Sequence, residues 1–223
     1  MEKSRFVAFL ALASLALSGL VYGEEYHSIT HRRIAGVMGA AGADWLTRPE
    51  REAEEHPDQA LDAIGIEKGS TVADIGAGVG YYSWRLAQRV GPQGLVYGED
   101  IQPEMLTKFR QNMADRKITN ARPVLGAYDD PKLPKEALDL AIMVDVYHEF
   151  SEPEKMLQHL RESMKPGGRL VLLEYRAEDP TVPIRPEHEM TVKMVRAEVE
   201  PEGFKFDKTI EVLPWQHIII FRK

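Results

Sequence analysis

The sequence predicts an α/β domain with a doubly wound, mostly parallel seven-stranded sheet that ends in an antiparallel hairpin. From residue 65 onward, short apolar runs alternate with longer segments of helical period, the pattern of parallel strands joined by helices. A glycine-rich turn, "GAGVG", follows the first of these apolar runs. At the C-terminus, the strand-like runs 204–213 and 217–223 have only "PWQ" between them. A parallel crossover needs about a dozen residues or more, so these last two strands must be antiparallel.

Residues 24–64 are predicted to form a helical lead-in that packs on the domain of residues 65–223. The segment is amphipathic and carries a leucine-isoleucine stripe among charged residues. Thr47 is a candidate N-cap, with Pro49 in the first turn and Glu50 at the capping-box position.

Each element of the main domain follows from a local signal. Apolar runs bounded by turn residues predict strands, while proline at the first turn and "KPGG" after the last turn delimit helices. Strands are expected at 71–75, 95–99, 121–125, 137–145 and 169–174, before the two strands of the hairpin. Helices are expected at 81–90, 103–115, 153–164 and 187–200.

The N-terminus has the layout of a secretory signal peptide spanning residues 1–23. A short basic opening precedes a continuous apolar run at 6–22, and small residues, Val21 and Gly23, stand before a polar segment. This predicts an exported or periplasmic protein. The alternatives are a wrongly chosen start codon, or an uncleaved inner-membrane anchor, which would be the chain's only contact with a membrane. No cysteine follows the run, which excludes a lipoprotein.

Composition excludes several classes of function. A formal net charge of -7 argues against a nucleic-acid partner, because binding phosphates needs a basic surface. The absence of cysteine excludes disulfides, thiol nucleophiles and thiolate metal sites.

The glycine-rich turn predicts a nucleotide site. In open α/β sheets the ligand lies beyond the carboxyl ends of the strands, and Gly76, Gly78 and Gly80 fall on the first of these turns. Glycine lets the backbone approach a ligand closely, although it also serves in ordinary tight turns.

Three further residues indicate which nucleotide binds. The dinucleotide motif needs a glycine where this chain has Tyr81. Asp74 precedes the turn with a carboxylate that would repel a pyrophosphate and attract a cationic group. Asp100 ends the second strand about 20 residues later, where an acid reaches a pair of ribose hydroxyls. An amine- or sulfonium-bearing nucleoside fits these residues better than NAD.

Four ordered motifs carry a family resemblance. "VADIGAGVGYYS", "VYGEDIQPEML", "ALDLAIMVDVYHEF" and "MKPGGRLVLLEY", followed by the hairpin, resemble the class I S-adenosylmethionine-dependent methyltransferases from residue 57 to the C-terminus. Within this superfamily the chain is most similar to small-molecule methyltransferases such as those acting on quinone precursors. "DDPKLP" and "EDPTVPIRPEHEM" also resemble uncharacterised bacterial members with N-terminal signal sequences.

The resemblance implies S-adenosylmethionine as cofactor and assigns residues to each part of it. The ribose hydroxyls would bind Asp100, Ile101 would flank the adenine, and Asp145 would lie near the sulfonium. Ala127 and Tyr128 would lie along the adenine edge, although family members often have an acidic residue where this chain has Ala127. The residues around the methionine part would be Asp74, Gly76, Ala77, Gly78 and Gly80.

Candidates for catalysis follow the fourth strand. Methyl transfer is a direct displacement, and a general base is needed only if the acceptor must lose a proton. His148 can serve as that base, or it can cap a loop; Asp145 and Tyr147 are the other candidates. Of Tyr147 and Glu149, one is expected to face the pocket and the other solvent.

The other histidines carry weaker expectations. His188 and His217 open later elements, whereas His27, His31 and His56 are expected at the surface. No histidine pair has the helical spacing of a zinc site, and although His188 beside Glu187 and Glu189 can be read as metal-binding, no metal is expected. Aromatic and apolar residues either line an acceptor pocket or pack in the core. These are Trp45, Leu46, Tyr81 and Tyr82.

The functional prediction is a methyltransferase acting on a small-molecule acceptor. Its rival is a non-catalytic module that binds the cofactor, because S-adenosylmethionine is made in the cytoplasm and an exported enzyme would lack it. An NAD-dependent oxidoreductase is excluded by Tyr81 and by the hairpin. The acceptor and the oligomeric state do not follow from the sequence.

Overall fold

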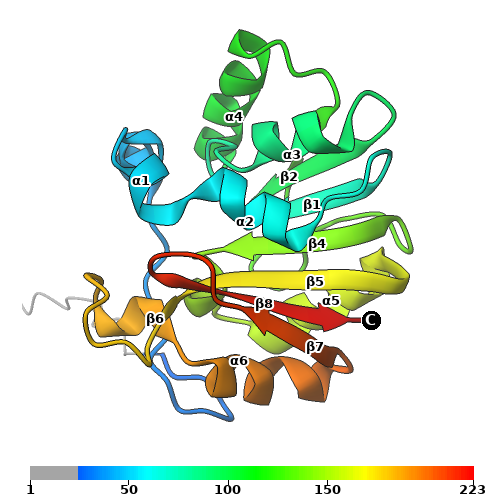
Figure 1. The fold of residues 1–223 in the computed structure, drawn as a ribbon. Coiled ribbons are helices and arrows are strands. Elements are labelled where there is room, and N and C mark those ends of the chain that lie inside the picture. Colours follow the sequence, from blue (N-terminus) through cyan, green and yellow to red (C-terminus); the bar gives the residue numbers. More distant parts are fainter. Residues whose placement is uncertain (1–24) are drawn as a thin grey trace, which may run out of the picture.

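The computed structural model describes residues 25–223, which form one central sheet with helices on both faces (Figure 1). The signal peptide expected at residues 1–23 lies outside the described residues. Among the described residues, no helix has the length and apolar character needed to cross a bilayer.

The sheet has the predicted doubly wound order. Along the sheet the strands run β3-β2-β1-β4-β5-β8-β7, and a short β6 pairs with β5 outside this path. β8 is antiparallel both to β5 and to β7, which confirms the terminal hairpin. The strands are β1 (Thr71–Ile75), β2 (Leu95–Asp100), β3 (Ala121–Leu125), β4 (Leu138–Val144), β5 (Met164–Arg176), β6 (Glu189–Met190), β7 (Lys205–Ile210) and β8 (Gln216–Arg222).

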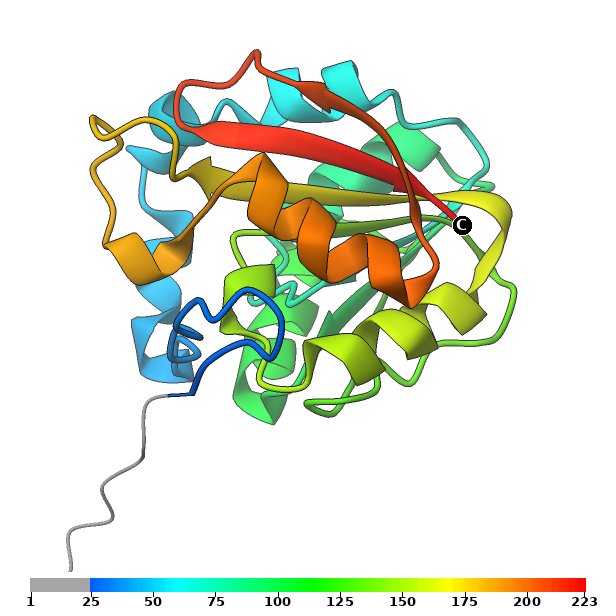
Figure 2. The same cartoon turned by 90° about the horizontal axis from the view of Figure 1, so that it is seen from below.

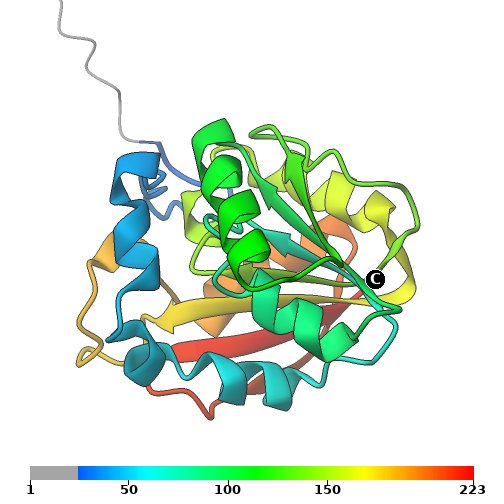
Figure 3. The same cartoon turned by 90° about the horizontal axis from the view of Figure 1, so that it is seen from above.

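Helices cover the two faces in separate groups. α5 and α6 cover one face in Figure 2, and α2, α3 and α4 cover the other in Figure 3. Leu157 and Val195 pack on the first face, and Leu61 and Leu86 on the second. The α-helices are α1 (Arg51–Glu55), α2 (Pro57–Ile64), α3 (Ser83–Val90), α4 (Pro103–Asp115), α5 (Pro153–Ser163) and α6 (Val192–Val199). The 3-10 helices are η1 (Ala40–Thr47), η2 (Tyr147–Glu149), η3 (Pro186–His188) and η4 (Glu200–Glu202).

The lead-in is less helical than its sequence suggests. Residues 25–39 form no helix, and the predicted cap at Thr47 is wrong, because its hydroxyl donates to the Asp44 carbonyl and α1 begins at Arg51. His56, at a left-handed φ of 48°, breaks the remaining helix into α1 and α2.

The helix predicted at 187–200 is also wrong for residues 187–191. Residues 186–188 form η3 and residues 189–190 form β6, so the helix starts only after Thr191. The Thr191 hydroxyl caps it by accepting the amide N–H of Met194. Pairing of β6 with the end of β5 takes the backbone groups that a longer helix would have used.

Gly98 in β2 lets α4 pack close to the sheet. A Cβ on Gly98 would lie 2.5 Å from Cζ of Phe109 and still nearer to the adjoining ring carbon. We expect Gly98→Ala to lower the free energy of unfolding by about 1–3 kcal/mol or more, because a buried ring and backbone must move apart. Gly36→Ala is the matched control, since nothing lies within 4 Å of its added Cβ. Equal midpoints of urea unfolding for the two variants would contradict the close packing of Phe109 on Gly98.

Candidate active site

A cavity of about 660 Å³ lies at the carboxyl ends of the parallel strands. In Figure 1 the arrowheads of β4 and β5 point toward η1 and α1 on one side and the segment carrying β6 on the other. Residues of both segments line the cavity, among them Trp45 and Leu46 of the lead-in and Arg185 and His188 near η3. The lead-in therefore completes the cavity that the sheet opens.

The glycine turn after β1 is fixed by the end of β2. The amide N–H of Gly78 donates to Oδ2 of Asp100 (2.9 Å), and that of Ala77 donates to the carbonyl of Glu99 (2.7 Å). Gly76 and Gly78 have φ values of 64° and 55°, which glycine adopts without strain. Both line the cavity together with Ala77.

Gly80 has a different place from the one its motif suggests. It is not among the residues that line the cavity, and a Cβ added there would meet Met113 (2.7 Å) and Phe109 (2.8 Å) of α4. Gly80 therefore allows α4 to pack against the turn, and its expected contact with the methionine part of the cofactor stays a prediction.

Three buried carboxyls surround this turn. Ser83 donates to Oδ2 of Asp74 (2.5 Å), and burial raises the pKa of Asp74 to about 7. Burial also raises the pKa of Glu99 to about 8 and that of Asp100 above its usual value. Oε1 of Glu99 has no hydrogen-bond partner among the described residues. Glu99 was missed by the sequence interpretation, because its neighbour Asp100 matches the motif.

These raised pKa values predict how stability depends on pH. Between about pH 4.5 and 8, folded Glu99 keeps a proton that the unfolded chain has released, so the free energy of unfolding falls as pH rises. We expect Glu99→Gln to make this slope shallower by at most about 1.4 kcal/mol per pH unit. Urea unfolding of the cofactor-free protein from pH 5 to 8 measures it. The exposed Glu104→Gln is the control, and a Glu99→Gln slope equal to that control would contradict the prediction.

A second buried polar group lies where β4 ends. Asp145 has a left-handed φ of 50° and accepts a bond from Nε2 of Gln216 at Oδ2 (3.0 Å). Burial raises the pKa of Asp145 well above its usual value. Nearby, Nε of Arg51 donates to Oε1 of Glu55 (2.7 Å). Within residues 25–223, Oδ1 of Asp145, Oε2 of Glu55 and the Tyr82 hydroxyl have no partner. This group offers acceptor atoms for a cationic ligand.

Beyond the glycine turn, the cavity is lined by Ile101, Gln102 and Tyr128. Gln102 ties this part to the lead-in, because its side chain donates to the carbonyl of Met38 (2.9 Å) and accepts the amide N–H of Ala40 (3.0 Å). Ala127 does not line the cavity; it pairs through its backbone with Asp130, so its predicted contact with the adenine is not supported.

A cluster of imidazole and carboxylate groups occupies the other end of the cavity. Nδ1 of His148 lies 2.6 Å from Oε2 of the fully buried Glu174, and Nε2 of His148 lies 3.0 Å from Nδ1 of His188. Burial lowers the pKa of His188 and raises the pKa of the adjacent Glu149 to about 7. His148, Glu149 and His188 all line the cavity.

Tyr147 does not belong to this site. It is fully buried in the core between the sheet and α5, so its predicted catalytic role is wrong, and Glu149 is the residue that faces the cavity. His27 is also buried, contrary to expectation, with Nε2 3.2 Å from Glu198. His217 lies between the carboxylates of Glu211 and Glu178 rather than in the cavity.

Comparisons with known proteins agree with this architecture. Residues 66–212, more than half of the chain, match the methyltransferase domain family. A crystal structure of a SAM-dependent methyltransferase from Aquifex aeolicus superimposes with a TM-score of 0.79 and 26% identity, covering 83% of this chain and 99% of the other.

Two curated relatives are similar over shorter spans. An arsenite methyltransferase of Halobacterium salinarum is 33% identical over 104 residues, 47% of this chain and 27% of the relative. A ubiquinone/menaquinone biosynthesis C-methyltransferase, UbiE, of Idiomarina loihiensis is 29% identical over 116 residues, 52% of this chain and 46% of the relative. The chain thus spans less than half the length of these curated relatives.

The fold and the cavity at the ends of its strands define an enzyme of the class I S-adenosylmethionine-dependent methyltransferases. The chain belongs to the methyltransferase domain family, and S-adenosylmethionine is its cofactor.

Proposed function

We propose that this enzyme transfers the methyl group of S-adenosylmethionine to a small-molecule acceptor held in the same cavity. One observation carries the proposal: a single cavity extends from the glycine turn to the cluster of His148, Glu149 and His188. Its volume of about 660 Å³ has the size of small-molecule sites. The names of the arsenite and ubiquinone/menaquinone relatives, which refer to small molecules, support this class of acceptor.

The parts of the cavity fit the parts of the cofactor. In this proposal Asp100 binds the ribose hydroxyls and Ile101 flanks the adenine. The ammonium group of the methionine part binds the unpartnered oxygens of Asp145 and Glu55. Burial raises the pKa of Asp145 in the cofactor-free protein, and the bound cation favours the ionised form of this carboxyl, which in turn favours the nearby sulfonium.

The acceptor then occupies the remaining space beside His148. Apolar side chains such as Phe150 and the buried Met156 line the cavity, and the exclusion of water that they favour is what direct displacement requires. The methyl carbon forms a bond to the acceptor as its bond to sulfur breaks, and sulfur keeps the bonding electrons.

The test measures both binding and turnover. Calorimetric titration of S-adenosylhomocysteine into the full-length chain should show micromolar binding, with none for NAD. A panel of phenols, catechols and quinols is then screened for acceptor-dependent formation of S-adenosylhomocysteine. His148→Ala should keep the affinity and lower the turnover. Binding without turnover on any small molecule would favour the non-catalytic module.

We also propose export, from the layout of residues 1–23 alone. Cell fractionation and N-terminal sequencing test it: a mature chain beginning at Glu24 in an exported fraction is expected. An intact chain in the inner-membrane fraction would favour the uncleaved anchor, and an intact cytoplasmic chain would contradict both. Export would require a supply of S-adenosylmethionine outside the cytoplasm.

A further inference from the structure

Three side chains in the part of the cavity around His148 form a candidate metal-binding group. His148, Glu149 and His188 each offer one ligand atom, and these atoms all lie within 4.8 Å of one another. We propose that they bind one divalent transition-metal ion, and that an oxygen of the methyl acceptor binds an open position on that ion. The second half rests on the proposed function, whereas the first half does not.

The spacing of the two imidazole nitrogens fits a shared ion. Nε2 of His148 and Nδ1 of His188 are 3.0 Å apart, and the two rings are nearly perpendicular, at 88°. Nitrogen ligands bind such ions at about 2.0–2.1 Å. A nitrogen–metal–nitrogen angle of about 90° therefore places the two nitrogen atoms about 3.0 Å apart. In the metal-free state Nδ1–H of His188 donates to Nε2 of His148, and binding of the ion requires this proton to move to Nε2 of His188.

A buried carboxylate orients the first ligand. The fully buried Glu174 accepts the Nδ1–H of His148 at 2.6 Å and the amide N–H of Tyr147 at 3.0 Å. Because a carboxylate fixes the proton on Nδ1, Nε2 of His148 keeps its lone pair toward His188. Metal-binding histidines commonly have such a carboxylate on the second ring nitrogen, where it raises their basicity.

The pairing of β6 with β5 brings His188 close to His148 and Glu149. His148 and Glu149 lie on η2 directly after β4, but His188 ends η3, 40 residues further along. Glu189 pairs with Tyr175 of β5, which follows Glu174. The two-residue strand β6 therefore fixes His188 beside the Glu174–His148 pair.

The ligand set indicates the kind of ion and its role. Two imidazoles and a carboxylate suit zinc, manganese, iron(II) or cobalt better than calcium or magnesium, which prefer oxygen ligands. Three protein ligands leave positions open, as in catalytic rather than structural sites. A hydroxyl bound to such an ion releases its proton to water more easily. Its oxygen then takes the methyl group, while the C–S bond breaks and sulfur keeps the electron pair.

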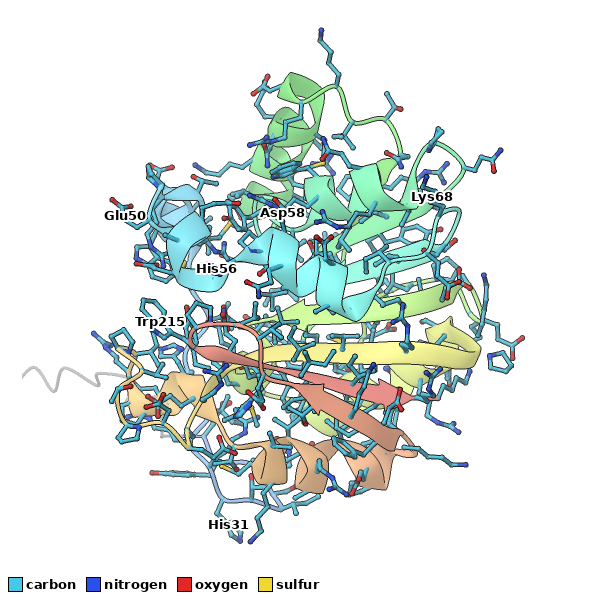
Figure 4. The ribbon with its side chains drawn as sticks, viewed as in Figure 1. His31, Glu50, His56, Asp58, Lys68 and Trp215 are labelled. Atoms are coloured by element: carbon cyan, nitrogen blue, oxygen red, sulfur yellow. The ribbon has the colours of Figure 1, made fainter. Side chains whose placement is uncertain are left out.

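Cobalt(II) is the probe for the site, because its visible absorption reports on its ligands. The untagged full-length chain is stripped with a chelator and titrated with Co²⁺. We expect saturation at one ion per chain with ligand-field bands, whereas His188→Ala and Glu149→Gln should each weaken binding at least about tenfold. Glu174→Gln should weaken it about 10- to 100-fold. The matched control is His31→Ala, an exposed histidine that points away from the body of the molecule (Figure 4).

Several outcomes would overturn the proposal. Absence of saturable binding, or Co²⁺ affinity unchanged in both His188→Ala and Glu149→Gln, would remove the metal site. With S-adenosylhomocysteine bound, added catechol should shift the Co²⁺ bands, and unchanged bands would remove the acceptor contact. S-adenosylhomocysteine titrations of the metal-free samples test the proposed function separately, since cofactor binding does not depend on the ion.

Discussion

Glu198→Gln should destabilise the protein by about 3–5 kcal/mol, because it leaves a buried arginine without its counter-charge. Glu198 is fully buried on α6, and Arg32 reaches both of its oxygens through Nε (2.9 Å) and Nη2 (3.1 Å). His27 and the Thr30 hydroxyl contact the same carboxylate. The lead-in is therefore anchored to the domain through one buried charge.

This anchor also supports the active site. Nη1 of Arg32 donates to the carbonyl of His148 (2.9 Å), and the amide N–H of Ala35 donates to the same oxygen (3.1 Å). We therefore expect Glu198→Gln to loosen the loop that carries His148 as well as to lower stability.

Urea unfolding measures the stability effect. The control is Glu200→Gln, which removes an exposed ion pair with Arg196 and should cost less than about 1 kcal/mol. Arg32→Ala combined with Glu198→Gln should cost less than the sum of the two single changes, since the second removes an already unpaired charge. Additive costs, or a Glu198→Gln midpoint equal to that of the control, would contradict the anchor.

Asp100→Asn should weaken S-adenosylhomocysteine binding by about 30- to 150-fold, or about 2–3 kcal/mol. Its Oδ2 accepts the amide N–H of Gly78 (2.9 Å), and its Oδ1 accepts that of Gln102 (2.8 Å). Both oxygens thus have one lone pair left for a hydroxyl. An amide group would turn one acceptor into a donor that faces a backbone N–H, which disturbs the turn as well as the ribose contact.

Calorimetry of Asp100→Asn against Asp115→Asn tests this assignment. Asp115 is exposed at the far end of α4, so its variant should bind as the native chain does. Native affinity in Asp100→Asn would remove the ribose assignment.

The fold was predictable because its signals are local. Proline at position 103 opens α4, the short "PWQ" link forces β7 and β8 to be antiparallel, and the glycine turn follows β1. The positions of Asp74 and Asp100 at the cavity were also predictable from this motif, since the carboxyl ends of parallel strands meet at one edge of the sheet. Tyr147 was wrongly assigned to the site, because a motif gives a residue's position along the chain but not the face it packs against.

The rest of the site required the tertiary structure. Arg51 and Glu55 reach Asp145 only because the lead-in folds over the strand ends, and no spacing in the sequence links residues 51 and 145. His188 meets His148 only because β6 pairs with β5. The sequence by itself determined the doubly wound fold class, the terminal hairpin and the cofactor, since these follow from local alternation, a short link and a few ordered motifs. Only the tertiary structure decided which charges share one buried space, because that depends on the packing of segments far apart in the chain.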